Sequence, residues 1–230
     1  MKDTKILLVE DDKSLNYLIE ESLESEGYSL VSVADGMEGY DAYYSGKPDL
    51  IILDIMLPKL DGFSLARKIR ISDKSTPIIF LTAKEQKKDI VEGFKIGCDD
   101  YVLKPFSLEE LYLRIVAVLR RVKNQLNNSE NNDYSIGEYK FLVNRRALTH
   151  PKEAFELTTR ETDVLQYLCR NLNERVSRED ILIQFWERSD IYTSRSLDVF
   201  ISKLRKYLSH DDSIKIESIR GYGFKLLVLK

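Results

Sequence analysis

Cysteine and histidine are scarce in this chain, since each occurs twice among 230 residues. Cys98 and Cys169 are isolated, with no C-x-x-C pair and no histidine cluster beside them. A structural zinc site needs several such ligands at short spacing, and a disulfide scaffold needs more cysteines. We therefore expect neither, and a reducing cytosol is the natural setting for the chain.

Long apolar runs and glycine-rich loops are also missing. No uninterrupted apolar run approaches the roughly 20 residues that a membrane-spanning helix needs. The start, Met1-Lys2-Asp3-Thr4, leads straight into a strand-like run, which argues against a signal peptide. No glycine-rich loop follows that first run, so nucleotide binding is not expected. The sequence thus predicts a cytoplasmic protein that has no membrane partner.

The chain does have a normal core composition and an uneven distribution of charge. Hydrophobic residues make up 43% and charged residues 32%, which suits a folded protein, and 230 residues are enough for two domains. Residues 1–121 carry 17 Lys and Arg against 22 Asp and Glu, whereas residues 122–230 carry 18 against 16. This balance favours a cation site in the acidic half and a polyanionic partner for the mildly basic half.

The clearest break in the chain is residues 122–133, which hold five asparagines and few apolar side chains. Such a segment buries too little surface to offset the entropy lost on ordering, so we interpret it as a flexible linker. The sequence therefore predicts a first domain over residues 1–121, a linker over 122–133 and a second domain over 134–230.

Short apolar runs alternate with helical patterns before the linker. The runs at 6–9, 50–53, 78–81 and 101–103 are continuously apolar, as in strands buried on both faces, and residues 30–33 mark a fifth strand. Between the runs, apolar residues follow the 3.6-residue period of helices. Five such β-α units predict an α/β fold, a doubly wound five-stranded parallel sheet.

Polar side chains follow four of these runs: Glu10 and Asp11 after the first, Asp54 after the third, Thr82 after the fourth and Lys104 after the last. The carboxyl ends of parallel strands meet at one edge of a sheet, so we expect these side chains to lie together. A single acidic residue in such a place is usually the N-cap of the next helix. Clustered carboxylates, however, destabilise a fold unless a cation compensates their charge.

Carboxylate oxygens at this edge suit Mg²⁺. A carboxylate can attack phosphorus and form an acyl phosphate if the charge on the phosphoryl oxygens is neutralised. The metal can cover one oxygen, the Lys104 ammonium another and the Thr82 hydroxyl the third. The pattern predicts a site that accepts a phosphoryl group on Asp54, rather than a hydrolase built for turnover.

The second half has a different pattern. In residues 134–150, apolar and polar side chains alternate loosely, as in a small antiparallel sheet. Thr158 and Glu161 then have the spacing of a helix capping box. A longer helix around residues 197–208 has one apolar and one basic face, and residues 214–225 alternate and turn at glycine, as in a β-hairpin. This order predicts an α+β winged helix-turn-helix domain that binds DNA.

Both halves resemble one known family. Residues 3–121 resemble the flavodoxin-like receiver domain of two-component response regulators, through Glu10-Asp11, Asp54, Thr82, Lys104, Ile55-Met56-Leu57-Pro58 and Asp61-Gly62. Residues 134–229 are similar to the winged-helix effector domain of the OmpR/PhoB type. The similar segments are Arg195-Ser196-Leu197-Asp198-Val199-Phe200-Ile201-Ser202-Lys203-Leu204-Arg205 and Ile219-Arg220-Gly221-Tyr222-Gly223-Phe224.

The resemblance implies roles for residues of the first half. The implied residues are Asp54 as phosphoacceptor; Asp11, Asp54 and the Met56 carbonyl as Mg²⁺ ligands, with Glu10 acting through water; and Lys104, Thr82 and Tyr101 as phosphoryl contact and switch. The Lys104–Pro105 bond is implied to be cis. A dimer interface is implied at Asp100, Glu110 and Arg114, although Ile90 replaces the basic residue that usually faces Glu110.

DNA contacts are implied in the second half. The implied residues are Asp198, Ser202 and Lys203 at base edges, and Trp186, Arg195, Arg205 and Arg220 at the backbone or the wing side of the groove. Lysine lacks the bidentate fork of arginine, so we expect the residue at position 203 to be less selective for guanine than the arginine that is frequent there in relatives.

The function that follows is a phosphorylation-activated, DNA-binding transcriptional regulator, not an enzyme. Its expected partners are a sensor histidine kinase, double-stranded promoter DNA, RNA polymerase and, on activation, a second copy of the chain. Two alternatives stay open at this point. One is a haloacid-dehalogenase-like phosphatase, although Met56 stands where such enzymes have the acidic proton donor. The other is a DNA-binding repressor that never uses phosphate.

Overall fold

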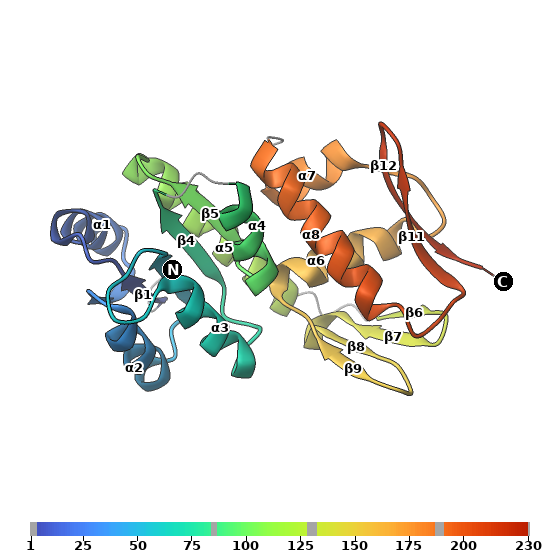
Figure 1. Cartoon of the computed structure of the whole chain (residues 1–230), viewed down its shortest axis with the longest axis horizontal. Coiled ribbons are helices and arrows are strands. Elements are labelled where there is room, and N and C mark those ends of the chain that lie inside the picture. The colour runs from blue at the N-terminus through green and yellow to red at the C-terminus, as the bar shows by residue number, and fades with distance from the viewer. Residues whose placement is uncertain (1–3, 84–86, 128–132, 187–190, 230) are drawn as a thin grey trace. The chain divides into compact units, whose positions relative to one another are not determined.

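The computed structural model describes residues 4–83, 87–127, 133–186 and 191–229 (Figure 1). The chain folds into two compact units, residues 1–122 and 123–230. Within the described residues, no helix is long and apolar enough to cross a membrane.

The first unit is a five-stranded parallel sheet of order β2-β1-β3-β4-β5 with helices between successive strands, as predicted. Its elements are β1 (Lys5–Val9), α1 (Lys13–Ser25), β2 (Ser29–Val33), α2 (Gly36–Gly46), β3 (Leu50–Asp54), α3 (Gly62–Ser72), β4 (Ile78–Thr82), α4 (Lys87–Ile96), β5 (Asp100–Leu103) and α5 (Leu108–Asn127). Every residue of β3 and β4 is buried, which is why these runs are continuously apolar rather than alternating.

Two helical layers cover the sheet. On one face, apolar residues of α1 and α5 such as Leu23 and Ile115 pack on Ile6, Leu8 and Ile52 of the strands. On the other face lie α2, α3 and α4, and there the Phe63 ring of α3 meets the Phe80 ring of β4 at 5.2 Å. This arrangement leaves the carboxyl ends of the strands free to carry a site.

Helix α5 continues to Asn127, so residues 122–127 of the predicted linker are helical. Lys123, Gln125 and Leu126 are good helix formers and prolong a helix that is already anchored on the sheet. The asparagine-rich composition did not reveal this extension. Residues 128–132 of the predicted linker lie outside the described residues.

The second unit begins with a four-stranded antiparallel sheet, and the chain then forms three helices and a hairpin. The sheet comprises β6 (Tyr134–Ile136), β7 (Tyr139–Leu142), β8 (Ala147–Thr149) and β9 (Ala154–Glu156), with a 3₁₀ turn at Val143–Arg145. The helices are α6 (Thr159–Arg170), α7 (Arg178–Trp186) and α8 (Ile191–Tyr207), and the second sheet joins β10 (Val176–Ser177) to the hairpin of β11 (Ile214–Ile219) and β12 (Gly223–Val228). The predicted order of helices followed by a hairpin is confirmed (Figure 1).

Candidate functional site

Asp54 lies at the last position of β3, with its side chain almost fully buried at the edge of the sheet. Its Oδ1 accepts a hydrogen bond from the backbone N–H of Met56 at 2.8 Å, and its Oδ2 lies 2.5 Å from the Lys104 ammonium. Gly62 packs against this residue so closely that an added Cβ would lie 2.1 Å from the Asp54 carbonyl oxygen. A glycine at position 62 is therefore required by the close backbone approach.

Glu10 provides a second buried carboxylate, 2.7 Å from the same Lys104 ammonium. Burial raises the pKa of Glu10 above its ordinary value, and the charge of Asp54 adds to this, whereas the hydrogen bond from Lys104 acts in the opposite direction. Burial alone would lower the pKa of Lys104, but its hydrogen bonds to Asp54 and Glu10 outweigh that effect and raise it. Lys104 therefore stays charged between two carboxylates at neutral pH.

Asp11 completes an acidic cluster with these two residues. One carboxylate oxygen from each of Glu10, Asp11 and Asp54 lies within 4.8 Å of the others, with Asp11 exposed and the other two buried. Three hard oxygen donors at this spacing, balanced by a single ammonium, fit a divalent cation such as Mg²⁺. The predicted gathering of strand-end residues at one edge is thus present in the structure.

Thr82 and Tyr101 lie beside this cluster on adjacent strands, and both side chains are buried. Burial raises the pKa of Tyr101, and a hydrogen bond with the Thr82 side chain acts in the opposite direction. The Tyr101 ring also packs at 6.2 Å from Phe80 and 6.4 Å from Phe94 of α4. The Lys104–Pro105 peptide bond is cis, as the resemblance implied.

The three residues of the expected dimer interface contact one another within the chain. Arg114 Nη1 lies 3.2 Å from Asp100 Oδ2, and its Nη2 lies 2.5 Å from Glu110 Oε1. Glu110 therefore pairs with a cation on the next turn of its own helix, whereas Ile90 of α4 is buried. Arg114 thus holds both carboxylates that the sequence assigned to intermolecular pairs.

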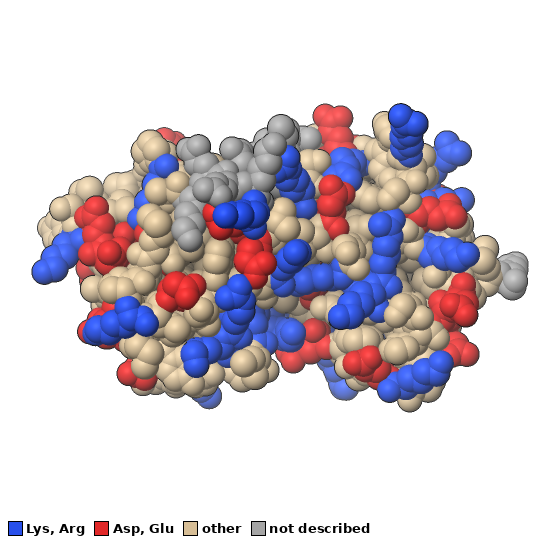
Figure 2. All heavy atoms as spheres, viewed as in Figure 1, with Lys and Arg blue, Asp and Glu red and all other residues tan. Residues whose placement is uncertain are grey.

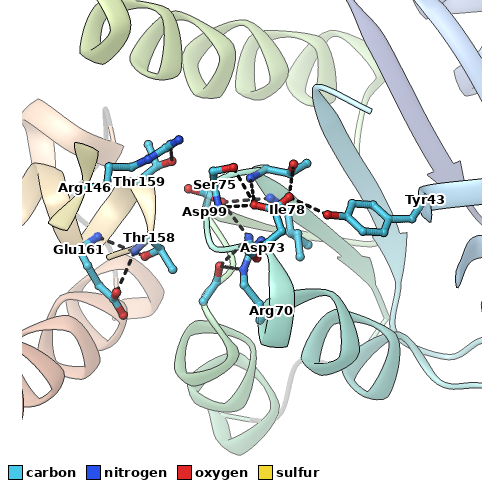
Figure 3. Close-up of polar contacts among 12 residues, drawn as sticks. Tyr43, Arg70, Asp73, Ser75, Ile78, Asp99, Arg146, Thr158, Thr159 and Glu161 are labelled. Atoms are coloured by element: carbon cyan, nitrogen blue, oxygen red, sulfur yellow. Dashed lines mark hydrogen bonds and ion pairs between the residues drawn. The ribbon is translucent and has the colours of Figure 1, made fainter. Parts of the chain in front are cut away.

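Sequence reasoning missed a polar cluster at the opposite edge of this sheet (Figure 3). Arg70 of α3 is buried and donates hydrogen bonds to the Gly97 carbonyl at 3.1 and 3.0 Å and to the Asp73 carbonyl at 3.1 Å. Its Nη2 also lies 3.6 Å from the Asp99 carboxylate, which accepts the N–H of Ile78. The cluster fixes the loops before β4 and β5, and a charged residue on an amphipathic helix gives no sign of such burial.

The second unit presents basic side chains over α8 and beside the hairpin, with fewer acidic ones among them (Figure 2). Of the residues expected to contact DNA, Ser202 and Arg220 are exposed and Arg195 is half-buried. Asp198 is 57% exposed and pairs with Arg178 of α7, a residue that the sequence analysis did not single out. A pocket of about 650 Å³ between the start of α7 and the hairpin is lined by Arg178, Arg220 and Tyr222, among others.

Three other residues of the expected DNA set are engaged inside the unit. Lys203 lies 2.6 Å from the buried carboxylate of Glu161, and Arg205 donates to the Ile216 carbonyl and the Ser218 hydroxyl, both at 2.8 Å. Trp186 is buried, with its ring 5.9 Å from Phe200 and 4.4 Å from the Arg160 guanidinium carbon. Periodicity put these residues on α7 and α8 but could not show which neighbours they meet.

Comparisons with known proteins match both units. Residues 6–116 match the family described as "Response regulator receiver domain", and residues 152–226 match "Transcriptional regulatory protein, C terminal". The transcriptional regulatory protein RprY of Bacteroides fragilis (strain YCH46) is 47% identical over 223 residues, which cover 97% of this chain and 94% of the relative.

A further relative and a solved structure extend the likeness over the whole chain. The alkaline phosphatase synthesis transcriptional regulatory protein PhoP of Bacillus subtilis (strain 168) is 36% identical over 230 residues, with 96% of each chain covered. A solved structure of a RitR mutant superposes with a TM-score of 0.76 at 24% identity and covers 97% of this chain and 98% of its own, which shows the fold. The receiver match implies a histidine kinase partner, and the C-terminal match implies DNA binding.

Proposed function

Because the chain belongs to the OmpR/PhoB family of two-component response regulators, which are transcription factors and not enzymes, we propose that phosphorylation of Asp54 controls its binding to promoter DNA. The observation that carries this proposal is the buried Asp54 carboxylate beside Glu10, Asp11 and the Lys104 ammonium. A sensor histidine kinase is the expected donor. We expect this action in the cytoplasm, where promoter DNA is found.

The proposed transfer uses the carboxylate of Asp54 as nucleophile. One of its oxygens forms a bond to phosphorus as the bond from phosphorus to the donor nitrogen breaks, which leaves an acyl phosphate. Lys104, which already lies 2.5 Å from Oδ2, shifts its ammonium to a phosphoryl oxygen. Asp11, Asp54 and the Met56 carbonyl would hold Mg²⁺, with Glu10 acting through water, and the bound ion supplies charge neutralisation for the phosphoryl oxygens.

The proposed signal passes through Thr82 and Tyr101. A phosphoryl group adds up to about two negative charges, which draw the Thr82 hydroxyl toward Asp54. Tyr101 lies on the strand next to that of Thr82, and its ring packs against Phe94 of α4, so we expect this ring to follow the movement of Thr82. We therefore propose that the surface of α4, β5 and α5 has two conformations, and that phosphorylation shifts the equilibrium between them.

We propose that this surface forms a homodimer on activation, with Asp100, Glu110 and Arg114 exchanging some of their internal pairs for intermolecular ones. Dimerisation makes the binding of the second effector domain to an adjacent half-site intramolecular, which raises affinity without any new DNA contact. Ile90 is buried and uncharged, so the Asp100–Arg114 pair is left as the main ionic contact that we propose for this interface.

On DNA, we assign base-edge contacts to Asp198 and Ser202 on α8, and backbone or wing-side contacts to Arg195 and Arg220. Lys203, by contrast, is assigned a structural role: its ammonium forms an ion pair with a buried carboxylate, that of Glu161, and so links α8 to α6. Arg205, although exposed, is assigned to holding β11 through the Ile216 carbonyl and the Ser218 hydroxyl, and the buried Trp186 is assigned to the core beneath α8. Binding at a promoter is expected to act on transcription through RNA polymerase.

The direct test exposes the full chain to acetyl phosphate and Mg²⁺ and follows mass and sedimentation together. We expect the mass to rise by one phosphoryl group and the sedimentation coefficient to shift to that of a dimer, with neither change in Asp54→Asn. Asp49→Asn, at a carboxylate one residue before β3, serves as the matched control and should behave as the wild type. An unchanged mass and an unchanged oligomeric state in the wild type would remove the proposed mechanism.

A further inference from the structure

Arg178, the first residue of α7, contacts α8 through both terminal nitrogens of its guanidinium. Nη1 donates hydrogen bonds to the carbonyl oxygen and the hydroxyl of Ser194 at 2.8 and 3.0 Å. Nη2 forms an ion pair with Oδ1 of Asp198, one helical turn further along α8. A planar fork with several fixed donors is suited to hold two such acceptors at once.

The same residue also fixes the hairpin. Its backbone N–H donates to the Tyr222 carbonyl at 2.9 Å, and its guanidinium carbon lies 5.0 Å from the centre of the Phe224 ring. Gly223, between these two residues, approaches so closely that an added Cβ would lie 2.6 Å from the Arg178 nitrogen. Arg178 therefore joins α7, α8 and the β11–β12 hairpin at one point.

Asp198 is left with one oxygen for a ligand. Its side chain is 57% exposed, and among the described residues only Arg178 bonds it, through Oδ1. An exposed carboxylate oxygen on a helix in the major groove accepts a hydrogen bond from the N4 amino group of cytosine. Because Arg178 holds the other oxygen, the carboxylate is fixed in one orientation before DNA arrives, so less side-chain entropy is lost on binding.

We propose that Arg178 is a positioning residue for sequence recognition, which orients Asp198 toward a cytosine and keeps the hairpin in register with α8. The inference rests on the proposed DNA-binding function and adds a residue that acts through another one. Ser194 and Asp198 take three of the five N–H donors of the Arg178 guanidinium, so most of its donors are engaged within the unit.

The experiment uses the full chain and a duplex selected by the wild type from random sequences. Dissociation constants are measured for this duplex and for variants in which each base pair is replaced in turn, at several salt concentrations. The proteins are the wild type, Asp198→Ala, Arg178→Ala, Arg178→Lys and the double variant Arg178→Ala/Asp198→Ala. Arg175→Ala, which removes an exposed arginine just before β10, is the matched control.

We expect Asp198→Ala to lose about tenfold discrimination at one G·C pair, which is within the range for a specific base contact. Arg178→Ala and Arg178→Lys should lose discrimination at that same pair, because lysine keeps the charge but not the fork. The double variant should be no worse than either single variant. The dependence of affinity on salt should stay as in the wild type, and Arg175→Ala should keep the full base preference.

Other outcomes overturn the proposal in recognisable ways. If Arg178→Ala loses affinity equally for all duplexes, and its affinity depends less steeply on salt concentration, Arg178 is a phosphate ligand. Additive losses in the double variant would show that Arg178 does not act through Asp198. If Arg178→Ala unfolds, Arg178→Lys carries the same comparison. A wild type that selects no duplex would remove the proposed function itself, which is a different result from a loss of preference at one pair.

Discussion

The Lys203 ammonium lies 2.6 Å from Oε1 of Glu161, so two elements of the second unit are joined by an ion pair with a buried carboxylate. The other oxygen, Oε2, accepts the N–H of Thr158 at 3.0 Å, which completes the capping box of α6 (Figure 3). Burial raises the pKa of the Tyr207 hydroxyl, and the charge of Glu161 adds to this. One acidic side chain thus fixes the start of α6 and the position of α8 against it.

Lys203→Ala should therefore lower the stability of the second unit more than it alters DNA recognition. Without the Lys203 ammonium, the buried Glu161 carboxylate loses its ion pair, and this loss should lower the free energy of unfolding by about 3 kcal/mol. Urea unfolding followed by the fluorescence of Trp186, the single tryptophan of the chain, measures this loss. Lys206→Ala, an exposed lysine of α8, is the control and should change the unfolding free energy little. If the stability of Lys203→Ala is unchanged but its affinity for preferred DNA sites falls, Lys203 contacts base edges instead.

Asp54→Asn should abolish the response of promoter occupancy to acetyl phosphate. Asparagine fills the same volume but cannot form the acyl phosphate, so occupancy should stay at the level of the unphosphorylated wild type. Chromatin immunoprecipitation from cells that carry either allele measures this directly. Equal occupancy in the two strains under inducing conditions would favour the alternative of a repressor that never uses phosphate.

The fold and most of the receiver site follow from the sequence because their signals are local. A buried parallel strand is a short continuous apolar run, and the residue that ends it falls at the edge of the sheet, which brought Glu10, Asp54 and Lys104 together in the prediction. The effector contacts followed less well. Helical periodicity places Lys203 and Asp198 on α8, but their partners Glu161 and Arg178 come from other elements, and only tertiary packing sets those pairs.

The buried Arg70 shows the same limit in the first unit. An arginine in α3 is ordinarily solvated, and nothing within several residues of it indicates that its donors meet the carbonyl of Gly97. Gly97 itself has a φ of 106° at the turn before β5, a conformation that favours glycine. Such long-range pairs need the folded chain, because they join loops that the sequence separates.

Arg114→Ala should weaken the phosphorylated dimer by at least about tenfold, the effect expected for the loss of a largely desolvated ionic contact. Phosphoryl uptake should be unchanged, because Arg114 lies on α5 away from Asp54. Sedimentation equilibrium in acetyl phosphate and Mg²⁺ gives the dimer constant, and mass gives the uptake. Lys68→Ala, which removes an exposed cation from α3, should leave both unchanged. A dimer of wild-type strength in Arg114→Ala would place the interface on another surface.

Asp73 offers a test of electrostatics far from the phosphoacceptor. Burial by itself raises the pKa of Asp73, but hydrogen bonds from Thr76, Ser75 and Tyr43 outweigh burial and hold the pKa well below its ordinary value. Tyr43 donates at 2.7 Å and Thr76 at 2.5 Å, so the charged form joins α2 to the loop before β4 (Figure 3). A lowered folded-state pKa means that this contribution to stability is complete above the ordinary pKa of 3.8. It is lost as the pH falls from there through the folded-state value.

Asp73→Asn should accordingly destabilise the first unit by about 2 kcal/mol at neutral pH, because an amide accepts fewer and weaker hydrogen bonds than a carboxylate. The difference from the wild type should stay constant from about pH 7 to pH 5 and shrink below about pH 4, where the Asp73 carboxylate of the unfolded wild type begins to protonate while the folded one stays charged. Urea unfolding followed by circular dichroism at each pH measures this difference in unfolding free energy. The fluorescence of Trp186 reports the unfolding of the second unit separately. Asp41→Asn, at an exposed carboxylate of α2, should show no such pH dependence. A penalty for Asp73→Asn that is equal at every pH would mean that loop geometry, and not the charge, stabilises this region.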